Sequence, residues 1–352
     1  MYNYSQSLEE RKERIKRNHI NDLSSDNLKY YFTTKANFKN SLESLSNLTV
    51  HKNYLDFYLD YVFRCKLTPG EPKEIMDNNG ISYSVTESLN MTLQDRQQYI
   101  FCIYHIGAYR TFIGQLVKNN YPFILLVDSN VYHRQKNRIR KSFERTCSYY
   151  GSRSELLLYN AEDESEFFKV YKKLKKGYSA IIFLDGNTGS GGVYQRNIKS
   201  QLSLKFFSKE LISRTGIAKL KFATGVDVLP IVCKREFVER TNYRIRIMAD
   251  LSPTSVDVGG TTRYLYKVLE KSISSDILEW EGWSYVHKYY KHEAYSPLDI
   301  DNMNYDELGY FRKGNSNYLM NLRNYYCYEV SNTTYKKVRT NLLESKIHDQ
   351  LF

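Results

Sequence analysis

Cysteine, proline and tryptophan are scarce in this chain of 352 residues, which has five, six and two of them respectively. The cysteines are scattered, their number is odd, and no two of them form a Cys-x-x-Cys pair. The sequence therefore favours reduced thiols over a disulfide framework or a thiolate zinc site. No cluster of His, Asp and Glu has the spacing of metal ligands either, so we expect no metal.

Long apolar runs are also missing. No segment approaches the ~18 consecutive apolar residues that a membrane-spanning helix requires. The N-terminal stretch is polar and lacks the apolar core of a signal peptide. We therefore expect a cytoplasmic protein without a transmembrane segment. Peripheral binding to a membrane surface is compatible with this expectation.

Positive charge is in excess, since 51 Lys and Arg against 39 Asp and Glu give a net charge of +12. With 41% hydrophobic residues the composition is typical of a globular protein. The charge and the 33 tyrosines would suit a nucleic-acid partner, but no zinc-finger, RRM or helix-turn-helix pattern is present. Because the charge is also spread along the chain, we predict no nucleic-acid binding, while charge alone leaves acidic lipid surfaces and heparin open.

Short apolar runs alternate with longer amphipathic stretches in the middle of the chain. Buried strands joined by helices indicate right-handed crossovers in a mostly parallel sheet. Strands are expected at 99–104, 123–127, 155–159, 180–184 and 226–232, and helices at 108–119, 131–150, 162–176 and 208–224. A further strand, antiparallel at an edge, is expected at 243–249, with helices at 263–274 and 276–290 after it.

The predicted fold is thus an α/β core with a mostly parallel central sheet flanked by helices and with two appendages. The N-terminal region, 1–95, is expected to be mostly helical, with helices at Ser7–Arg17 and Tyr54–Cys65. The core spans 96–292. The C-terminal appendage, 293–352, is rich in Tyr and Asn and is expected to be helical only near 335–346.

Functional side chains are expected where strands end, because ligands collect at the carboxyl ends of strands in open α/β sheets. His105 follows the first strand of the core and precedes Gly107 and the start of a helix. An imidazole has the pKa range to take a proton from an attacking hydroxyl or amine, although most lone histidines at strand ends merely cap or pack. Asp128 and Asp185 end two further strands.

Two more segments could bind a ligand. Asp185 opens a glycine-rich loop in which the backbone N–H groups of Gly186, Asn187 and Thr188 are offered to an anion. The loop is not a phosphate-binding P-loop and lacks the GxGxxG spacing, so a plain turn is an equal alternative. After Asp128 comes a helix that carries Arg134, Lys136, Arg138, Arg140, Lys141 and Arg145. Its basic side chains either form a solvated face or bind an acidic partner.

Six segments in order, 105–110, 183–188, 204–207, 215–223, 226–232 and 265–287, resemble motifs of the lysophospholipid acyltransferase superfamily. More narrowly, they are similar to the branch of lipid A (lauroyl/myristoyl) late acyltransferases. The resemblance covers roughly residues 98–292 and implies a glycerolipid acyltransferase-like fold. In that family the core opens with His, four residues, and Asp or Glu.

This chain departs from the family at the last position of that motif, where Arg110 stands in place of the acid. A guanidinium has donors only and cannot orient an imidazole as a carboxylate does. Either another carboxylate takes over or the site has lost its chemistry. Asp185 is slightly favoured over Asp128, because it opens the loop that resembles the family's acidic element. Arg110 would then bind a phosphate or carboxylate of the substrate.

The resemblance implies an acyltransferase in which His105 is the general base and no cofactor is needed beyond the donor substrate. The family's lipid A members usually begin with an anchoring helix, and the first ~95 residues here are too polar to insert. We therefore expect a soluble enzyme that passes an acyl group from an acyl or peptidyl carrier protein, or from CoA, to a hydroxyl or amine of a small molecule or peptide.

Backbone N–H groups near Gly107 or in Gly186–Gly192, or the side chain of Arg110, would bind the oxyanion. Arg134 and its basic neighbours would bind the donor's carrier. The alternative is a catalytically degenerate relative that binds a carrier protein or an acyl chain in a biosynthetic complex. A carboxylate within about 3 Å of a ring nitrogen of His105 distinguishes the enzyme from the degenerate protein.

Overall fold

The protein is described here by a computed structural model that covers residues 8–21, 25–42, 54–77, 81–186, 201–239, 242–252, 256–291 and 304–344. The chain divides into two compact units. The first comprises residues 1–8, 64–204 and 213–282, and the second comprises 9–63, 205–212 and 283–352. Residues of the predicted N-terminal region, 1–95, occur in both units.

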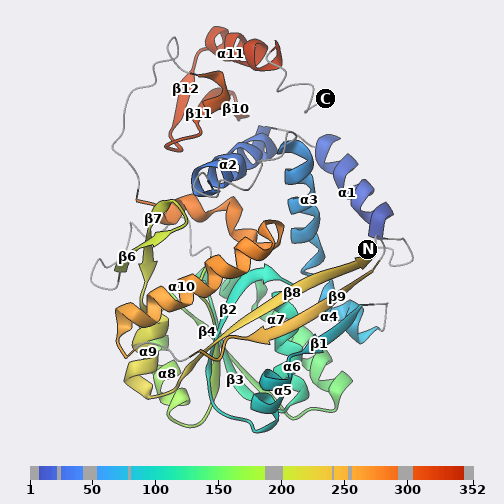
Figure 1. The fold of residues 1–352 in the computed structure, drawn as a ribbon, viewed down its shortest axis with the longest axis vertical. Helices are drawn as coiled ribbons and strands as arrows, with labels where there is room; N and C mark the ends of the chain where they lie inside the picture. Colours follow the sequence, from blue (N-terminus) through green and yellow to red (C-terminus); the bar gives the residue numbers. More distant parts are fainter. Residues whose placement is uncertain are drawn as a thin grey trace. The chain divides into compact units, whose positions relative to one another are not determined.

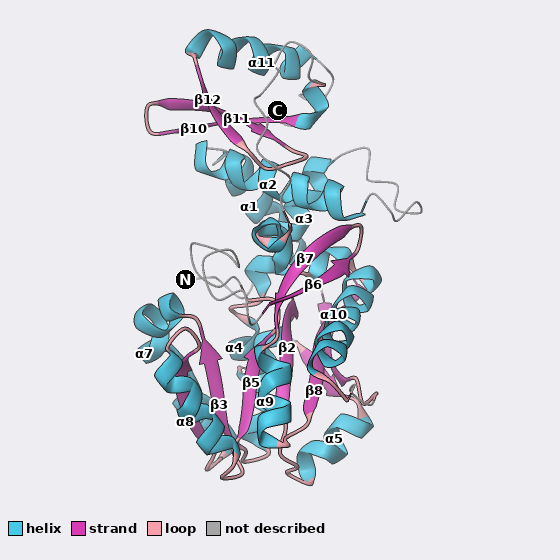
Figure 2. Cartoon of the chain, turned by 90° about the vertical axis from the view of Figure 1, so that its left-hand side faces the viewer, coloured by secondary structure: helices cyan, strands magenta, loops and turns pink. Residues whose placement is uncertain are grey.

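A seven-stranded sheet forms the centre of the first unit, in the order β1-β9-β8-β2-β5-β3-β4. The strands β8, β2, β5 and β3 run parallel (Figure 2). Strand β4 is parallel to β3, whereas β9 and β1 run in the opposite direction. The predicted mostly parallel α/β fold is therefore confirmed. The bounds are β1 Ser82–Val85, β2 Ile100–Gly107, β3 Pro122–Val127, β4 Glu155–Asn160, β5 Ser179–Phe183, β8 Val228–Glu239 and β9 Asn242–Ala249.

Helices cover both faces of this sheet (Figure 1). On one face lie α6 (Phe112–Lys118) and α7 (Ser129–Tyr150), and on the other lie α8 (Glu164–Leu174), α9 (Gly216–Thr224) and α10 (Val258–Ser275). Because both faces are covered, the central strand β2 is buried along nearly its whole length, which explains its continuous apolar sequence. The short helices α4 (Glu71–Met76) and α5 (Glu87–Gln94) flank β1 in the sequence.

The second unit pairs helices with a small antiparallel sheet. Helix α2 (Ser25–Leu42) approaches β10 (Leu308–Lys313) so closely that a Cβ on Gly309 would lie 2.6 Å from the Phe32 ring. The strands follow the order β10-β11-β12, a sheet that the prediction for the C-terminal appendage missed. The other elements are α1 Leu8–Asn21, α3 Tyr54–Leu67 (shared with the first unit from Arg64 on), β11 Ser316–Asn321, β12 Cys327–Val330 and α11 Asn332–Glu344.

Three local predictions were wrong. The helix expected at 208–224 begins only at Gly216, because β7 (Lys209–Arg214), whose burial partly alternates with period two, pairs with β6 (Gln201–Phe206) first. The helix expected at 276–290 is a series of 3₁₀ turns, η4 Ile277–Glu279, η5 Glu281–Ser284 and η6 Val286–Tyr289. Strand β9 is antiparallel as expected but is not an edge, since β1 pairs with its other side.

Candidate active site

Two neighbouring parallel strands bring His105 and Asp185 together. In the pairing of β2 with β5, Ile103 lies opposite Phe183, and the backbone N–H of Leu184 donates to the carbonyl of Ile103 at 3.0 Å. His105 and Asp185 each lie two residues further along. Because strand side chains alternate with period two, both emerge on the same face at the carboxyl edge of the sheet.

The carboxylate of Asp185 holds the imidazole of His105. Its Oδ1 lies 2.9 Å from His105 Nδ1, and both of its oxygens lie 3.1 Å from the backbone N–H of His105. The indole Nε1–H of Trp280 donates to Oδ2 at 2.6 Å. The Asp185 side chain is 4% exposed and that of His105 is 20% exposed. A buried carboxylate thus faces a partly open imidazole.

This contact fixes the chemistry of the ring. With Nδ1–H donating a hydrogen bond to Asp185, the neutral imidazole carries its free lone pair on Nε2. Burial lowers the pKa of His105, but the charge and hydrogen bond of Asp185, together with the charge of Glu281, outweigh burial and the opposing charge of Arg110. The pKa of His105 is therefore raised above its ordinary value of 6.5.

Two aromatic rings confine the imidazole. Phe183 stacks on it with ring centroids 4.6 Å apart, and Tyr109 meets it edge-on at 4.9 Å. Gly186 lies beside Cε1 of the imidazole, since a Cβ added to this glycine would be 3.9 Å from that atom. The ring therefore has one orientation, set by packing as well as by Asp185.

Arg110 lies on the exposed surface beside His105. Its Nε donates to the hydroxyl of Tyr109 at 3.4 Å, and that hydroxyl donates to Glu281 Oε2 at 3.2 Å. Burial and the charge of Glu281 raise the pKa of Tyr109, so the phenol stays protonated and can donate. The guanidinium is thus turned toward Tyr109 and solvent, and Asp185 supplies the carboxylate at the ring.

Gly107 has a backbone role. Its φ is +60°, and a Cβ added to it would lie 2.0 Å from the carbonyl oxygen of Cys233, so only glycine fits. The next N–H, of Ala108, donates to that same carbonyl at 3.1 Å. It is therefore already used, which weakens the prediction of an oxyanion donor at this turn.

The remaining predicted residues lie apart from His105 or outside the described residues. Asp128 caps α7, accepting from the backbone N–H of Val131 at 2.9 Å. It ends β3, which pairs with β5 and not with β2. Arg134 is exposed on α7. Asn187 and Thr188 lie outside the residues that the structure describes.

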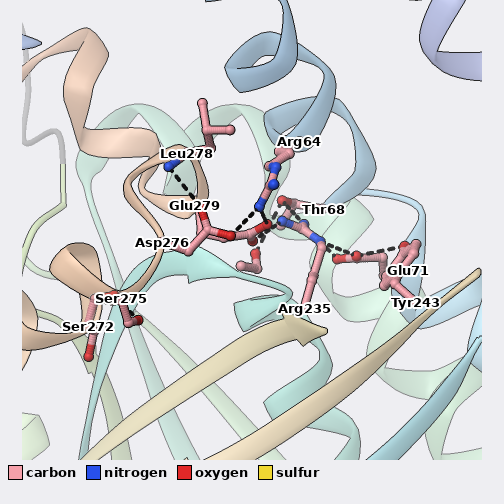
Figure 3. Close-up of polar contacts among 11 residues, drawn as sticks. Arg64, Thr68, Glu71, Arg235, Tyr243, Ser272, Ser275, Asp276, Leu278 and Glu279 are labelled. Carbon is pink, nitrogen blue, oxygen red and sulfur yellow. Dashed lines mark hydrogen bonds and ion pairs between the residues drawn. The ribbon is translucent and has the colours of Figure 1, made fainter. Parts of the chain in front are cut away.

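A buried charged network that the sequence did not reveal is centred on Arg235 (Figure 3). Arg235 donates to both carboxylate oxygens of Glu71, at 2.6 and 3.0 Å, and to Glu279 Oε2 at 2.6 Å. It also donates to Thr68 Oγ1 at 2.8 Å, and Thr68 in turn donates to the carbonyl of Gly107 at 3.4 Å. The network therefore reaches the turn that follows His105.

The rim of this network adds further pairs. Tyr243 donates to Glu71 at 2.8 Å. Arg64, in the last turn of α3, donates to Glu279 at 2.6 Å and to Asp276 at 2.5 Å. Burial lowers the pKa of Arg235, but the charges of Glu279 and Glu71 more than offset it, so its net pKa is raised and the guanidinium stays charged.

Membrane spans, metal ligands and thiols complete the description of the chain. No helix among the described residues is long and apolar enough to cross a bilayer. No group of His, Cys, Asp and Glu in the described ranges is arranged to hold a metal ion. None of the five cysteines, all of which lie in the described ranges, forms a disulfide bond.

Comparison with known proteins gives the following matches. The family model described as bacterial lipid A biosynthesis acyltransferase matches residues 84–292. Among solved structures, the chain is similar to the crystal structure of the 1-acyl-sn-glycerophosphate acyltransferase PlsC from Thermotoga maritima. The identity is 14% and the TM-score 0.33, over 71% of this chain and 95% of that one. No curated protein matches.

Proposed function

This chain belongs to the bacterial lipid A biosynthesis acyltransferase family, and we propose that it is an acyltransferase in which His105 is the general base and Asp185 its carboxylate partner. Acyl transfer itself follows from the family. The observation that carries the assignment of residues is the 2.9 Å separation between His105 Nδ1 and Asp185 Oδ1. It favours an enzyme over a degenerate binding protein, because a general base needs an oriented ring.

The proposed reaction begins at Nε2 of His105, which takes the proton from an acceptor hydroxyl or amine. The acceptor's oxygen or nitrogen then forms a bond to the carbonyl carbon of an acyl thioester. The resulting tetrahedral species breaks its C–S bond and expels the thiolate, which takes the proton back from His105. Asp185 stabilises the imidazolium between these steps, and no covalent enzyme intermediate is required.

Arg110 is proposed to contact an anionic group of the substrate. It is exposed, it lies beside His105, and its guanidinium suits a phosphate or carboxylate. Arg110→Glu would recreate the acid of the family motif. We expect it to lower activity on the order of tenfold or more, mainly through KM for the anionic substrate. An increase in activity would contradict this role, and Arg110→Lys, which keeps the charge, is the matched control.

The donor is proposed to arrive on an acidic carrier protein. Helix α7 starts at the same edge of the sheet as the dyad, and four exposed basic residues recur along it at intervals of four, three and four positions. That spacing places them in one stripe. Within the described part of the chain no ion pair neutralises them. The basic stripe consists of Arg134, Arg138, Lys141 and Arg145.

Charge reversal tests this partner. Arg138→Glu with Lys141→Glu should raise KM for an acyl carrier protein about tenfold at low ionic strength, with a smaller effect at high salt, because the attraction is screened. Arg153→Glu is the matched control, since Arg153 is also exposed but precedes β4 at the opposite edge of the sheet. Equal effects of the two changes would contradict docking on the stripe.

The activity itself is tested by intact-mass spectrometry in a single turnover. The protein is mixed with a panel of acyl-carrier-protein and acyl-CoA thioesters and with hydroxyl or amine acceptors, and His105→Ala is the control. Loss of the acyl group that depends on His105 would support the proposal and identify the donor class. Binding of a carrier protein without any transfer would favour the degenerate alternative, for which Arg110 in the motif is the main support.

A further inference from the structure

We propose that Trp280 is a positioning residue that holds the Asp185 carboxylate in the orientation in which it serves His105. This inference rests on the proposed function, because it assigns a role toward the same pair. The contact with the pair is made by the indole Nε1–H, which donates to the carboxylate of Asp185.

The carboxylate's two oxygens are divided between two side chains. Oδ1 faces the imidazole at 2.9 Å, and Oδ2 accepts from the indole Nε1–H of Trp280 at 2.6 Å. An indole has one donor and no acceptor, so it can bind only an oxygen at that position. Trp280 is 2% exposed, so no water competes for this bond. A rotation of the carboxylate would therefore break both contacts.

The indole is itself fixed by its surroundings. A Cβ added to Gly282 would lie 2.2 Å from two atoms of the Trp280 ring, so the ring packs directly on the backbone of Gly282. The backbone of Trp280 also forms a β-bridge with Ile106, the residue after His105. Both ends of the Asp185 carboxylate are thus tied to the end of β2, one through His105 and the other through Trp280.

The residues on either side of Trp280 hold it in place. Glu279 accepts from Arg235 and Arg64 at 2.6 Å each, and Glu281 accepts from Tyr109 at 3.2 Å. Of three successive side chains, Glu279 therefore contacts the buried network, Trp280 contacts the carboxylate of Asp185, and Glu281 contacts Tyr109, whose ring packs on His105. The network of Figure 3 therefore anchors the segment that carries Trp280, because Glu279 belongs to both.

Removal of the indole N–H should change the proton affinity of His105 in a known direction. The groups that face His105 are Asp185 and Glu281, whose charges raise its pKa, Arg110, whose charge lowers it, and the phenol of Tyr109. The indole directs the positive end of its dipole at Asp185 and so weakens the negative potential at the ring. Without that donor, the pKa of His105 should rise.

The experiment compares Trp280→Phe with Tyr121→Phe in the full chain. Tyr121 is a matched control: it is 2% exposed and its hydroxyl donates to the carbonyls of Thr92 and Gln97, away from the dyad. The titration of His105 is followed by NMR of ¹³C-labelled histidine, with the resonance assigned by its loss in His105→Gln. This readout does not require activity, so it reports on Trp280 even if the proposed acyl transfer fails.

We expect a higher pKa for His105 in Trp280→Phe and an unchanged one in Tyr121→Phe. Single-turnover transfer should fall on the order of tenfold to a hundredfold in Trp280→Phe, with its acidic limb moved to higher pH and KM for the donor unchanged. An unchanged titration of His105, or a loss that appears only in KM, would overturn the proposal.

Gly282→Ala provides a second variant in which Trp280 itself is intact. Its Cβ displaces the indole ring and should move the His105 titration in the same direction as Trp280→Phe. If Trp280→Phe fails to fold, a folded Gly282→Ala with the titration of the unaltered chain would also overturn the proposal.

Discussion

The first unit contains two buried carboxylates, Glu71 in the charged network and Asp185 beside His105, whose described hydrogen-bond donors differ in charge. In the buried network, the side chain of Glu71 is bound by the guanidinium of Arg235, and both are 1% exposed. In the dyad, Asp185 is bound by the backbone N–H of His105 and the indole of Trp280, which are neutral donors. Arginine cancels the charge of Glu71, whereas the two donors described at Asp185 carry no charge and orient its carboxylate toward the imidazole.

The difference explains which group can do chemistry. A guanidinium keeps its proton at any accessible pH, so the network of Arg235 can hold structure but cannot pass a proton. The imidazole of His105 titrates, and its side chain is 20% exposed, so an acceptor can reach it. Arg110, the arginine of the motif, donates from its guanidinium to the hydroxyl of Tyr109.

Removal of the central arginine should give the largest loss of stability. Arg235→Met leaves Glu71 and Glu279 buried without their main partner, and we expect the free energy of unfolding to fall by about 3–5 kcal/mol. Urea denaturation measures this. Arg244→Met, an exposed arginine on β9, should change it by less than about 0.5 kcal/mol. Similar losses in the free energy of unfolding for Arg235→Met and Arg244→Met would contradict the structural role given to the buried network.

The dyad should make stability and activity respond to pH in opposite ways. Because the pKa of His105 is raised in the folded protein, its protonation stabilises the fold below pH 6.5, and this contribution is lost as the pH rises through the folded-state value. The free energy of unfolding of the unaltered chain should therefore exceed that of His105→Gln by more at pH 5.5 than at pH 8.5.

Activity should run the other way, since only the neutral imidazole accepts a proton. Transfer is expected to rise with pH and to level off above the folded-state pKa of His105, which lies above 6.5. A pH profile that is flat between about 5 and 8, for both stability and transfer, would show that His105 does not titrate as described.

The smallest effect is expected at the other aspartate of the sheet edge. Asp128→Ala removes the cap of α7 and should cost about 1 kcal/mol of stability. Transfer and the titration of His105 should not change. Thermal unfolding and the single-turnover assay check the two parts, and a large loss of transfer would return Asp128 to the list of catalytic residues.

The sequence predicts the parts of this molecule that depend on local pattern. Continuous apolar runs identify the parallel strands, and both Asp128 and Asp185 follow such a strand. The resemblance of its loop to the family's acidic element favoured Asp185, and it contacts His105 because β5 pairs with β2. The pattern fails where residues alternate over a short span, as in β7, and in the 3₁₀ turns after α10, where burial follows no helical period.

The other contacts between distant residues could not be predicted from the sequence. Arg235 meets Glu71 across 164 positions and Glu279 across 44, and no spacing rule connects them. The role of Trp280 was hidden for the same reason, since 95 positions separate it from Asp185. Its place in a segment that resembles a family motif was the only signal.

The central claim is that Asp185 replaces the carboxylate missing from the motif. The most direct test is single-turnover transfer by Asp185→Asn, in a protein shown to be folded, with Asp128→Asn beside it. We predict that Asp185→Asn loses about 10³–10⁴-fold in rate, because an amide no longer stabilises the imidazolium, while Asp128→Asn keeps its rate. A rate for Asp185→Asn within about tenfold of the unaltered chain would contradict the account.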